Sequence, residues 1–118
     1  MITHPRTEEL AEAVAAWIDQ IRPSLDPRNA FLARVAANAM ATIGRELTQG
    51  AAAEGAAVAA MAGLLGKAGG YEELSAELCA RIRSGELTVE TPGLLPALRV
   101  MARDQLAIDQ PSYRPEGS

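Results

Sequence analysis

Arginine, asparagine and aspartate are the residues of this sequence whose types and spacing best fit the chemistry of a site. They form two helical ridges, which comprise Arg34, Asn38 and Arg45 in the first half of the chain and Arg99, Arg103 and Asp104 near its end. Steps of four and seven residues place side chains on one side of a helix. If the two helices pack together, the ridges meet in one polar cluster.

The sequence allows two interpretations of this cluster. Guanidinium groups bind carboxylates and phosphates through paired hydrogen bonds, so the cluster is a candidate anion or partner site. Alternatively, it is a structural network in which Asp104 pairs with Arg34 or Arg103. Buried charges must be paired in any fold, and this requirement favours the structural interpretation.

The other residues of the sequence offer no catalytic group, metal site or cofactor site. His4 is the only histidine, so neither a Ser-His-Asp arrangement nor a histidine metal pair can be assembled. Cys79 lies beside an apolar helical face, which predicts a buried structural thiol. The segment from Gly63 to Lys67 fails the phosphate-loop pattern, because Ala68 stands where Ser or Thr is required. We interpret it as a helix end with a glycine stop. The acidic runs are spaced as solvated helix faces.

The stretch from Phe31 to Leu47 predicts a central, largely buried helix. Its larger apolar residues recur at steps of three and four and so share one face: Leu32, Val35, Ala36, Ala39, Met40, Ile43 and Leu47. The opposite face is made of small residues that allow another helix to approach closely: Ala33, Ala37, Ala41 and Gly44. We expect Val35 to lie in the core and Trp17 of the preceding helix to be buried against this helix.

The whole pattern predicts an all-α single domain over residues 1–118, with about five helices. The first helix starts at Thr7 as its N-cap and ends before Pro23. The others are expected at about 27–49, where Asp26 is the N-cap and Gly50 the stop, and at 52–67, 71–84 and 95–109. The ends, residues 1–6 and 111–118, are expected to be mobile.

Charge and composition narrow the class of protein. The net charge is −4, and no run of Lys or Arg forms a basic patch, so nucleic acid is not expected as a partner. The apolar stretches are too short to span a bilayer, and a single cysteine fits a reducing compartment. We therefore expect a cytoplasmic protein without a membrane partner, and self-association stays open.

Two segments resemble a family of small, uncharacterised, all-helical bacterial proteins. They are the central FLARVAANAMATIGREL and the closing LRVMARDQLAIDQPSY. The matching positions are Phe31, Arg34 to Ala39, Arg45 to Leu47, Arg103-Asp104, Leu106-Ala107, Pro111 and Tyr113. The resemblance extends to the opening helix and to the segment from Leu78 to Ile82.

This resemblance implies a setting rather than a reaction. The family is encoded beside aminoglycoside-phosphotransferase-like kinases and acyl-CoA dehydrogenases, and includes the small partner of the hydroxyacyl-CoA kinase of levulinic acid catabolism. It implies a non-catalytic accessory subunit of a phosphotransferase-type kinase acting on hydroxyacyl-CoA, with Arg99 or Tyr113 as contact candidates. The alternative is a small helical binder of an acyl or CoA-type anion, with Arg34 and Arg103 gripping the anion.

Overall fold

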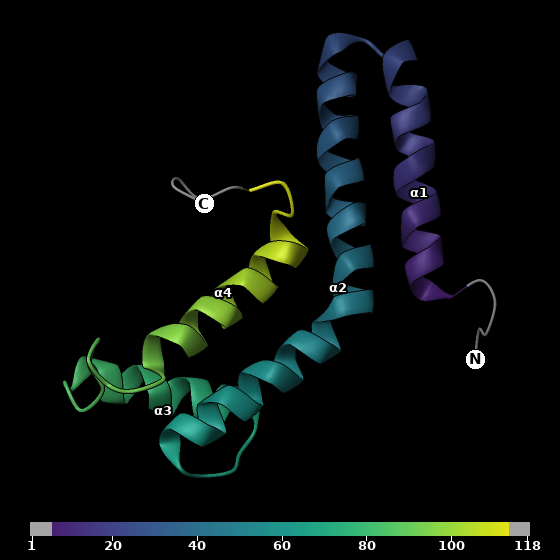
Figure 1. Ribbon diagram of the computed structural model, residues 1–118. Helices are drawn as coiled ribbons and strands as arrows, with labels where there is room; N and C mark the ends of the chain where they lie inside the picture. The colour runs from purple at the N-terminus through teal and green to yellow at the C-terminus, as the bar shows by residue number, and fades with distance from the viewer. Residues whose placement is uncertain (1–5, 114–118) are drawn as a thin grey trace. The chain divides into compact units, whose positions relative to one another are not determined.

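The computed structural model describes residues 6–113, and this range is helical throughout its regular structure (Figure 1). The elements are α1 (Thr7–Ile21), the short 3-10 helix η1 (Arg22–Ser24), α2 (Pro27–Leu65), α3 (Tyr71–Arg83) and α4 (Leu94–Asp109). The predicted all-α class is confirmed, with four α-helices in the described range instead of five. The ends that were expected to be mobile lie largely outside this range.

The difference in helix number arises at Gly50, which does not stop a helix. Segments 27–49 and 52–67 were predicted as separate helices, but α2 runs through both as one helix of 39 residues. A glycine stop requires a positive φ angle, which the described glycines adopt only at Gly66, Gly85 and Gly93. A glycine inside a helix costs about 1 kcal/mol relative to alanine, and the alanine-rich segment that follows offsets this cost.

The start of α2 is fixed by Asp26, as predicted. The backbone N–H of Asn29 donates to Asp26 Oδ2 at 3.3 Å, and the side-chain amide of Asn29 donates to Asp26 Oδ1 at 2.6 Å. Pro27 occupies the first helical position, where its missing N–H is not needed. The predicted cap of α1 was wrong, because Thr7 is already helical and Arg6 holds the N-cap position without a side-chain hydrogen bond.

The capping role of Asp26 predicts a pH dependence of stability. The hydrogen bonds from Asn29, that of its side chain above all, lower the pKa of the Asp26 carboxyl below its ordinary value of 3.8. A lowered folded-state pKa means that the stabilisation is present above pH 3.8 and is lost as pH falls through the folded pKa. Asp26→Asn keeps a cap but removes the charge. The difference in melting temperature between the wild type and Asp26→Asn should therefore shrink only when the pH falls below 3.8.

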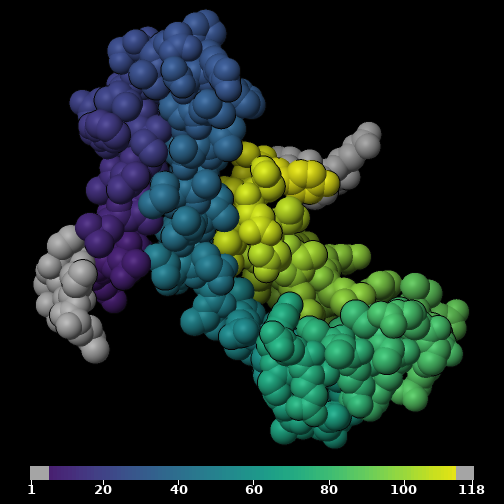
Figure 2. All heavy atoms as spheres, turned by 180° about the vertical axis from the view of Figure 1, so that it is seen from behind, coloured from purple at the N-terminus to yellow at the C-terminus, as the bar shows by residue number. Residues whose placement is uncertain are grey.

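The chain divides into two compact units, Met1–Gly50 and Ala51–Ser118, and α2 contributes to both. In the first unit α1 and the beginning of α2 form an antiparallel hairpin (Figure 1, Figure 2). Small residues line its contact, where Ala11, Ala37 and Gly44 are all buried. A Cβ atom placed on Gly44 would lie 3.8 Å from the Ala11 Cβ and 3.6 Å from the Glu12 Cγ. The predicted close approach of a helix to the small face of α2 is confirmed.

The predicted burial of the larger face of α2 was wrong. Val35 is 50% exposed, and Leu32, Ile43 and Leu47 are exposed to a similar degree. Trp17 is 59% exposed instead of buried. A helix with two apolar stripes can present only one of them to a single neighbour, and α1 packs on the stripe that lets the backbones come closest. The bulky stripe is left at the side of the hairpin.

The second unit holds the larger core. Its buried residues come from the last part of α2, from α3, from the connector that follows and from α4: Ala57, Met61, Leu65, Leu74, Leu78, Leu87 and Leu94. Met61 and Leu74 are completely buried. Leu98 and Met101 pack against this core from α4. α4 begins at Leu94, one residue before the predicted start at 95, and Pro96 falls in the first turn, where it removes no helical hydrogen bond.

None of the helices in residues 6–113 combines the length and the hydropathy needed to cross a membrane.

Candidate functional site

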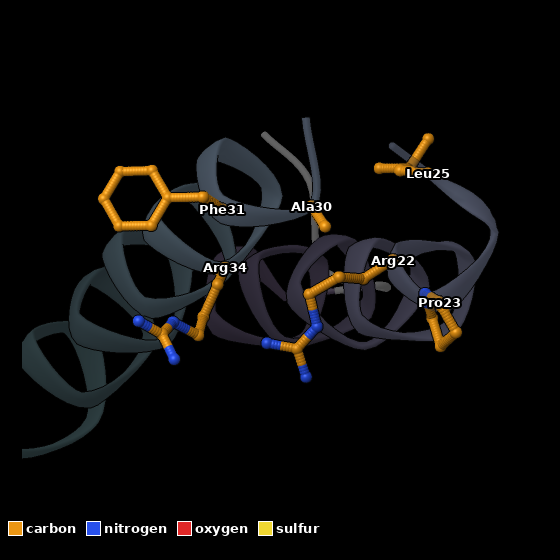
Figure 3. Close-up of a pocket in the computed structure, with 6 residues that line it drawn as sticks. All are labelled: Arg22, Pro23, Leu25, Ala30, Phe31 and Arg34. Atoms are coloured by element: carbon orange, nitrogen blue, oxygen red, sulfur yellow. The ribbon is translucent and has the colours of Figure 1, made fainter. Parts of the chain in front are cut away.

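A shallow pocket of about 420 Å³ lies at the turn of the hairpin and is open to solvent (Figure 3). Its walls come from η1, the following loop and the first two turns of α2: Arg22, Pro23, Leu25, Ala30, Phe31 and Arg34. Figure 3 shows the guanidinium groups of Arg22 and Arg34 on the same side of the pocket. The pocket therefore offers two cationic groups and an apolar wall.

The two arginines are held to different degrees. The Nη2 atom of Arg22 lies 3.6 Å from Oδ1 of Asp19 in an ion pair across one helical turn. The guanidinium carbon of Arg34 lies 6.0 Å from the centroid of the Phe31 ring, which places the cation over the aromatic face. Within the described residues Arg34 makes no ion pair. Guanidinium groups so placed can bind a carboxylate or a phosphate, with Phe31 supplying apolar contact.

The first predicted ridge is present on α2, and it faces solvent at Arg34 and Asn38. Arg45 is partly buried, and its Nη2 donates to Thr42 Oγ1 at 3.1 Å. Thr42 Oγ1 in turn donates to the carbonyl oxygen of Asn38 at 2.9 Å. Arg45 is thus tied to its own helix.

The second predicted ridge lies on α4, in the other compact unit. Arg99 and Arg103 are exposed, and Asp104 is partly buried. In the described part of the chain none of the three forms an ion pair, so the proposed pairing of Asp104 with Arg103 is not observed. The predicted cluster of Arg34 with Arg103 would join the two units and stays a prediction. Tyr113, the other contact candidate, is 54% exposed.

The acidic run on α3 has a structural role in this fold. Glu73 Oε1 and Glu77 Oε1 each lie 3.4 Å from Lys67 Nζ. The hydrogen bond to Glu77 is the main reason that the pKa of Lys67 is raised above 10.5. Lys67 follows Gly66, which ends α2 with φ +68°. The glycine-stop interpretation of the Gly63–Lys67 segment is therefore confirmed.

Two further expectations concern the metal-ligating and nucleophilic residues. Cys79 is exposed, so the predicted buried thiol was wrong; the buried stripe of α3 runs through Leu74 and Leu78 and leaves Cys79 outside it. Among residues 6–113 no three His, Cys, Asp or Glu side chains come close enough to hold a metal ion. His4 lies outside the described residues.

Arg22 was missed as a candidate because it stands outside both ridges. It precedes Pro23 and lies in a turn, where helical periodicity gives no direction for a side chain. The sequence did contain a signal for this residue. Arg22 and Arg34 stand on either side of a segment that holds a Pro-containing turn and Phe31, so a hairpin at this turn brings the two arginines together.

The chain belongs to the family described as "Domain of unknown function (DUF6285)", whose model matches residues 23–113. The match covers the pocket except for Arg22, and it covers all of α2, α3 and α4. No curated protein and no solved structure matches the chain.

Proposed function

We propose that this chain is a non-catalytic accessory subunit that binds a phosphotransferase-type kinase acting on hydroxyacyl-CoA. The partner class comes from the family resemblance of the FLARVAANAMATIGREL and LRVMARDQLAIDQPSY segments. The proposed role in binding a partner is supported by the exposed side chains on the outer face of α4. Leu95, Arg99 and Arg103 follow at steps of four, and all three are exposed. Neither arginine is paired within residues 6–113.

This face has the composition of a protein contact. Arginine is enriched at the centres of interfaces, where it combines an apolar stem with a charged group that can form several hydrogen bonds. Leu95 supplies an exposed apolar side chain on the same face. A complementary kinase surface would present carboxylates around an apolar depression. Tyr113 stands shortly beyond the end of α4 and offers an aromatic anchor to the same partner.

Co-expression with the kinase encoded beside this chain tests the proposal. We expect the two proteins to elute together in size-exclusion chromatography, and the kinase to be more active on a 4-hydroxyacyl-CoA in the complex. Replacing both Arg99 and Arg103 by glutamate should weaken binding at least about 30-fold, since each hot-spot arginine contributes about 1–2 kcal/mol. Arg83→Glu, at the exposed end of α3, is the matched control. Separate elution, with full kinase activity in the absence of this chain, would refute the proposal.

A second candidate function is the binding of an acyl or CoA-type anion, and the Arg22–Arg34 pocket favours it. Its two guanidinium groups suit a phosphate, and Phe31 suits an apolar group of the same ligand. A ligand that binds only the folded state raises the melting temperature, increasingly so above its Kd. We expect coenzyme A to raise the melting temperature of the wild type, and Arg34→Gln to abolish this shift while Arg83→Gln keeps it. An unchanged melting temperature at millimolar coenzyme A would exclude this function.

A further inference from the structure

The side of the hairpin carries an apolar face that the described residues leave open. On α1 the face comprises Leu10, Val14 and Trp17, and on α2 it comprises Leu32, Val35, Ile43 and Leu47. Each of these seven side chains is between 42% and 59% exposed. We call this set the hairpin face.

The two stripes fall on the same side of the hairpin. A helix turns by about 100° per residue, so Leu10, Val14 and Trp17 lie about a quarter turn to one side of the Ala11 contact line. On α2, Leu32, Ile43 and Leu47 lie on average slightly more than a quarter turn from the Ala37–Gly44 contact line, in the same rotational sense. Val35 lies about half a turn from that line, at the outer edge of the face. Because the two helices are antiparallel, equal rotational senses point to the same side of the pair. The stripes therefore merge into one continuous surface.

The hairpin face is large enough for a stable interface. Seven side chains, each about half exposed, amount to on the order of 700 Å², and each partner of a standard-size interface contributes roughly 800 Å². Exposed apolar patches above a few hundred Å² mark interaction surfaces in soluble proteins. The buried residues of the hairpin contact are alanine and glycine, namely Ala11, Ala37 and Gly44. Covering the face would add large apolar side chains to the buried residues of this unit.

The charged residues at the two ends of the hairpin face indicate which molecule binds it. Arg28 lies at the α2 start of the stripe and Glu46 near its other end, and both are exposed. Their separation of 18 residues corresponds to five turns of about 3.6 residues, so they lie on the same side of α2, about 27 Å apart. Neither forms an ion pair within residues 6–113. A surface with a cation at one end and an anion at the other is complementary to its own antiparallel copy.

We propose that the hairpin face binds a second copy of this chain, with the two α2 helices antiparallel and related by a two-fold axis. The midpoint between Arg28 and Glu46 is residue 37. Pairing about this level places Arg28 opposite Glu46 of the second copy. It also places Leu32 opposite Thr42, next to Ile43, and Val35 opposite the small Ala39.

The same symmetry accounts for α1. Gly44 lies beside Ala11 and Glu12, so residue 37 is level with the segment around Trp17 and Ile18 in the antiparallel partner helix. The two-fold axis therefore brings Trp17 next to Trp17 of the second copy. The product is a four-helix bundle in which each hairpin supplies two helices, an architecture that packs apolar stripes at its centre. The alternative pairing of α1 with α2 would bring Glu9 and Glu46 to the same level, where like charges repel.

The oligomeric state of the full-length chain tests this proposal, measured by sedimentation velocity over a dilution series. We expect a dimer whose Trp17 emission shifts to longer wavelength on dilution. Trp17 is the only tryptophan, so its emission reports this interface directly. Val35→Asp should weaken the dimer at least about 100-fold, because it places a charge against Ala39 of the second copy at two symmetry-related points close to the two-fold axis. Val100→Asp, at an equally exposed helical position of the second unit, should leave the dimer intact. Circular dichroism must show unchanged helix content.

A charge swap tests the register even if Val35→Asp fails to fold. Arg28→Glu alone, or Glu46→Arg alone, should weaken the dimer about tenfold at low salt, because each places like charges together at two symmetry-related points. The variant carrying both changes should regain the wild-type affinity. A chain that stays monomeric at the highest concentration reached refutes the proposal. So does a dimer that survives Val35→Asp, or a double variant that fails to recover. If Trp17 is already shielded from solvent in a monomer, the hairpin face binds the second unit of the same chain. If Trp17 becomes shielded only when the kinase is added, the face binds that partner.

Discussion

Leu74→Ala should lower the free energy of unfolding by about 2–5 kcal/mol, since it removes a completely buried side chain from the core of the second unit. Leu74 belongs to a cluster that joins the last part of α2 to α3, the connector and α4. These elements have little room to close the cavity, because Met61 and Leu78 beside it are themselves buried. A loss of this size is a large share of the total stability of a small domain.

Urea denaturation followed by circular dichroism measures this loss, and Ile82→Ala is its control. Ile82 lies on the same helix, is also a large aliphatic residue and is 40% exposed, so its truncation should cost about 1 kcal/mol. Trp17 fluorescence reports the first unit, whereas circular dichroism reports all helices, so the comparison shows which unit has been weakened. If the two variants unfold at the same urea concentration, the core of the second unit has been wrongly assigned.

Much of the fold could be predicted because helical periodicity and stop signals are local properties of the chain. The cap at Asp26, the start of α3 at Tyr71 and a glycine stop within the Gly63–Lys67 segment were predicted correctly. Gly50 was misinterpreted because glycine both permits a stop and is tolerated inside a helix. The choice depends on the packing of the segment that follows.

The exposed state of Trp17 and Val35 could not be predicted, because periodicity identifies an apolar stripe but not the element that covers it. On α2 two stripes compete for one neighbour, and the small stripe of Ala37 and Gly44 contacts α1. Burial of the larger stripe requires a further surface. The same reasoning explains how much of the candidate site could be predicted. The ridge of Arg34 and Asn38 was predicted from spacing, whereas the approach of Arg22 to Arg34 depends on the conformation of a turn.

Gly44→Leu is expected to have the second large effect, because it places a bulky side chain where α1 and α2 approach most closely. The Cβ position itself is tolerated: it would lie 3.8 Å from the Ala11 Cβ and 3.9 Å from the Glu8 carbonyl oxygen, which are ordinary contacts. The further carbons of leucine have no space and must push α1 away. Overpacking of this kind costs about 1–3 kcal/mol. Gly44→Ala should be neutral or stabilising, since alanine favours a helix over glycine by up to about 1 kcal/mol.

Gly55→Leu is the matched control, because Gly55 lies in the same helix and a Cβ there meets nothing within 4 Å. It should gain helix propensity without a steric cost, so the melting temperatures of the Gly44→Leu and Gly55→Leu variants should shift in opposite directions. Thermal melts followed by Trp17 fluorescence are the suitable measurement, since Trp17 lies on α1 and responds when α1 separates from α2. Equal melting temperatures for the two variants would show that α1 does not pack on the Ala37–Gly44 stripe. The bulky stripe containing Val35 would then be its binding surface, and the hairpin face would not be open to a second copy.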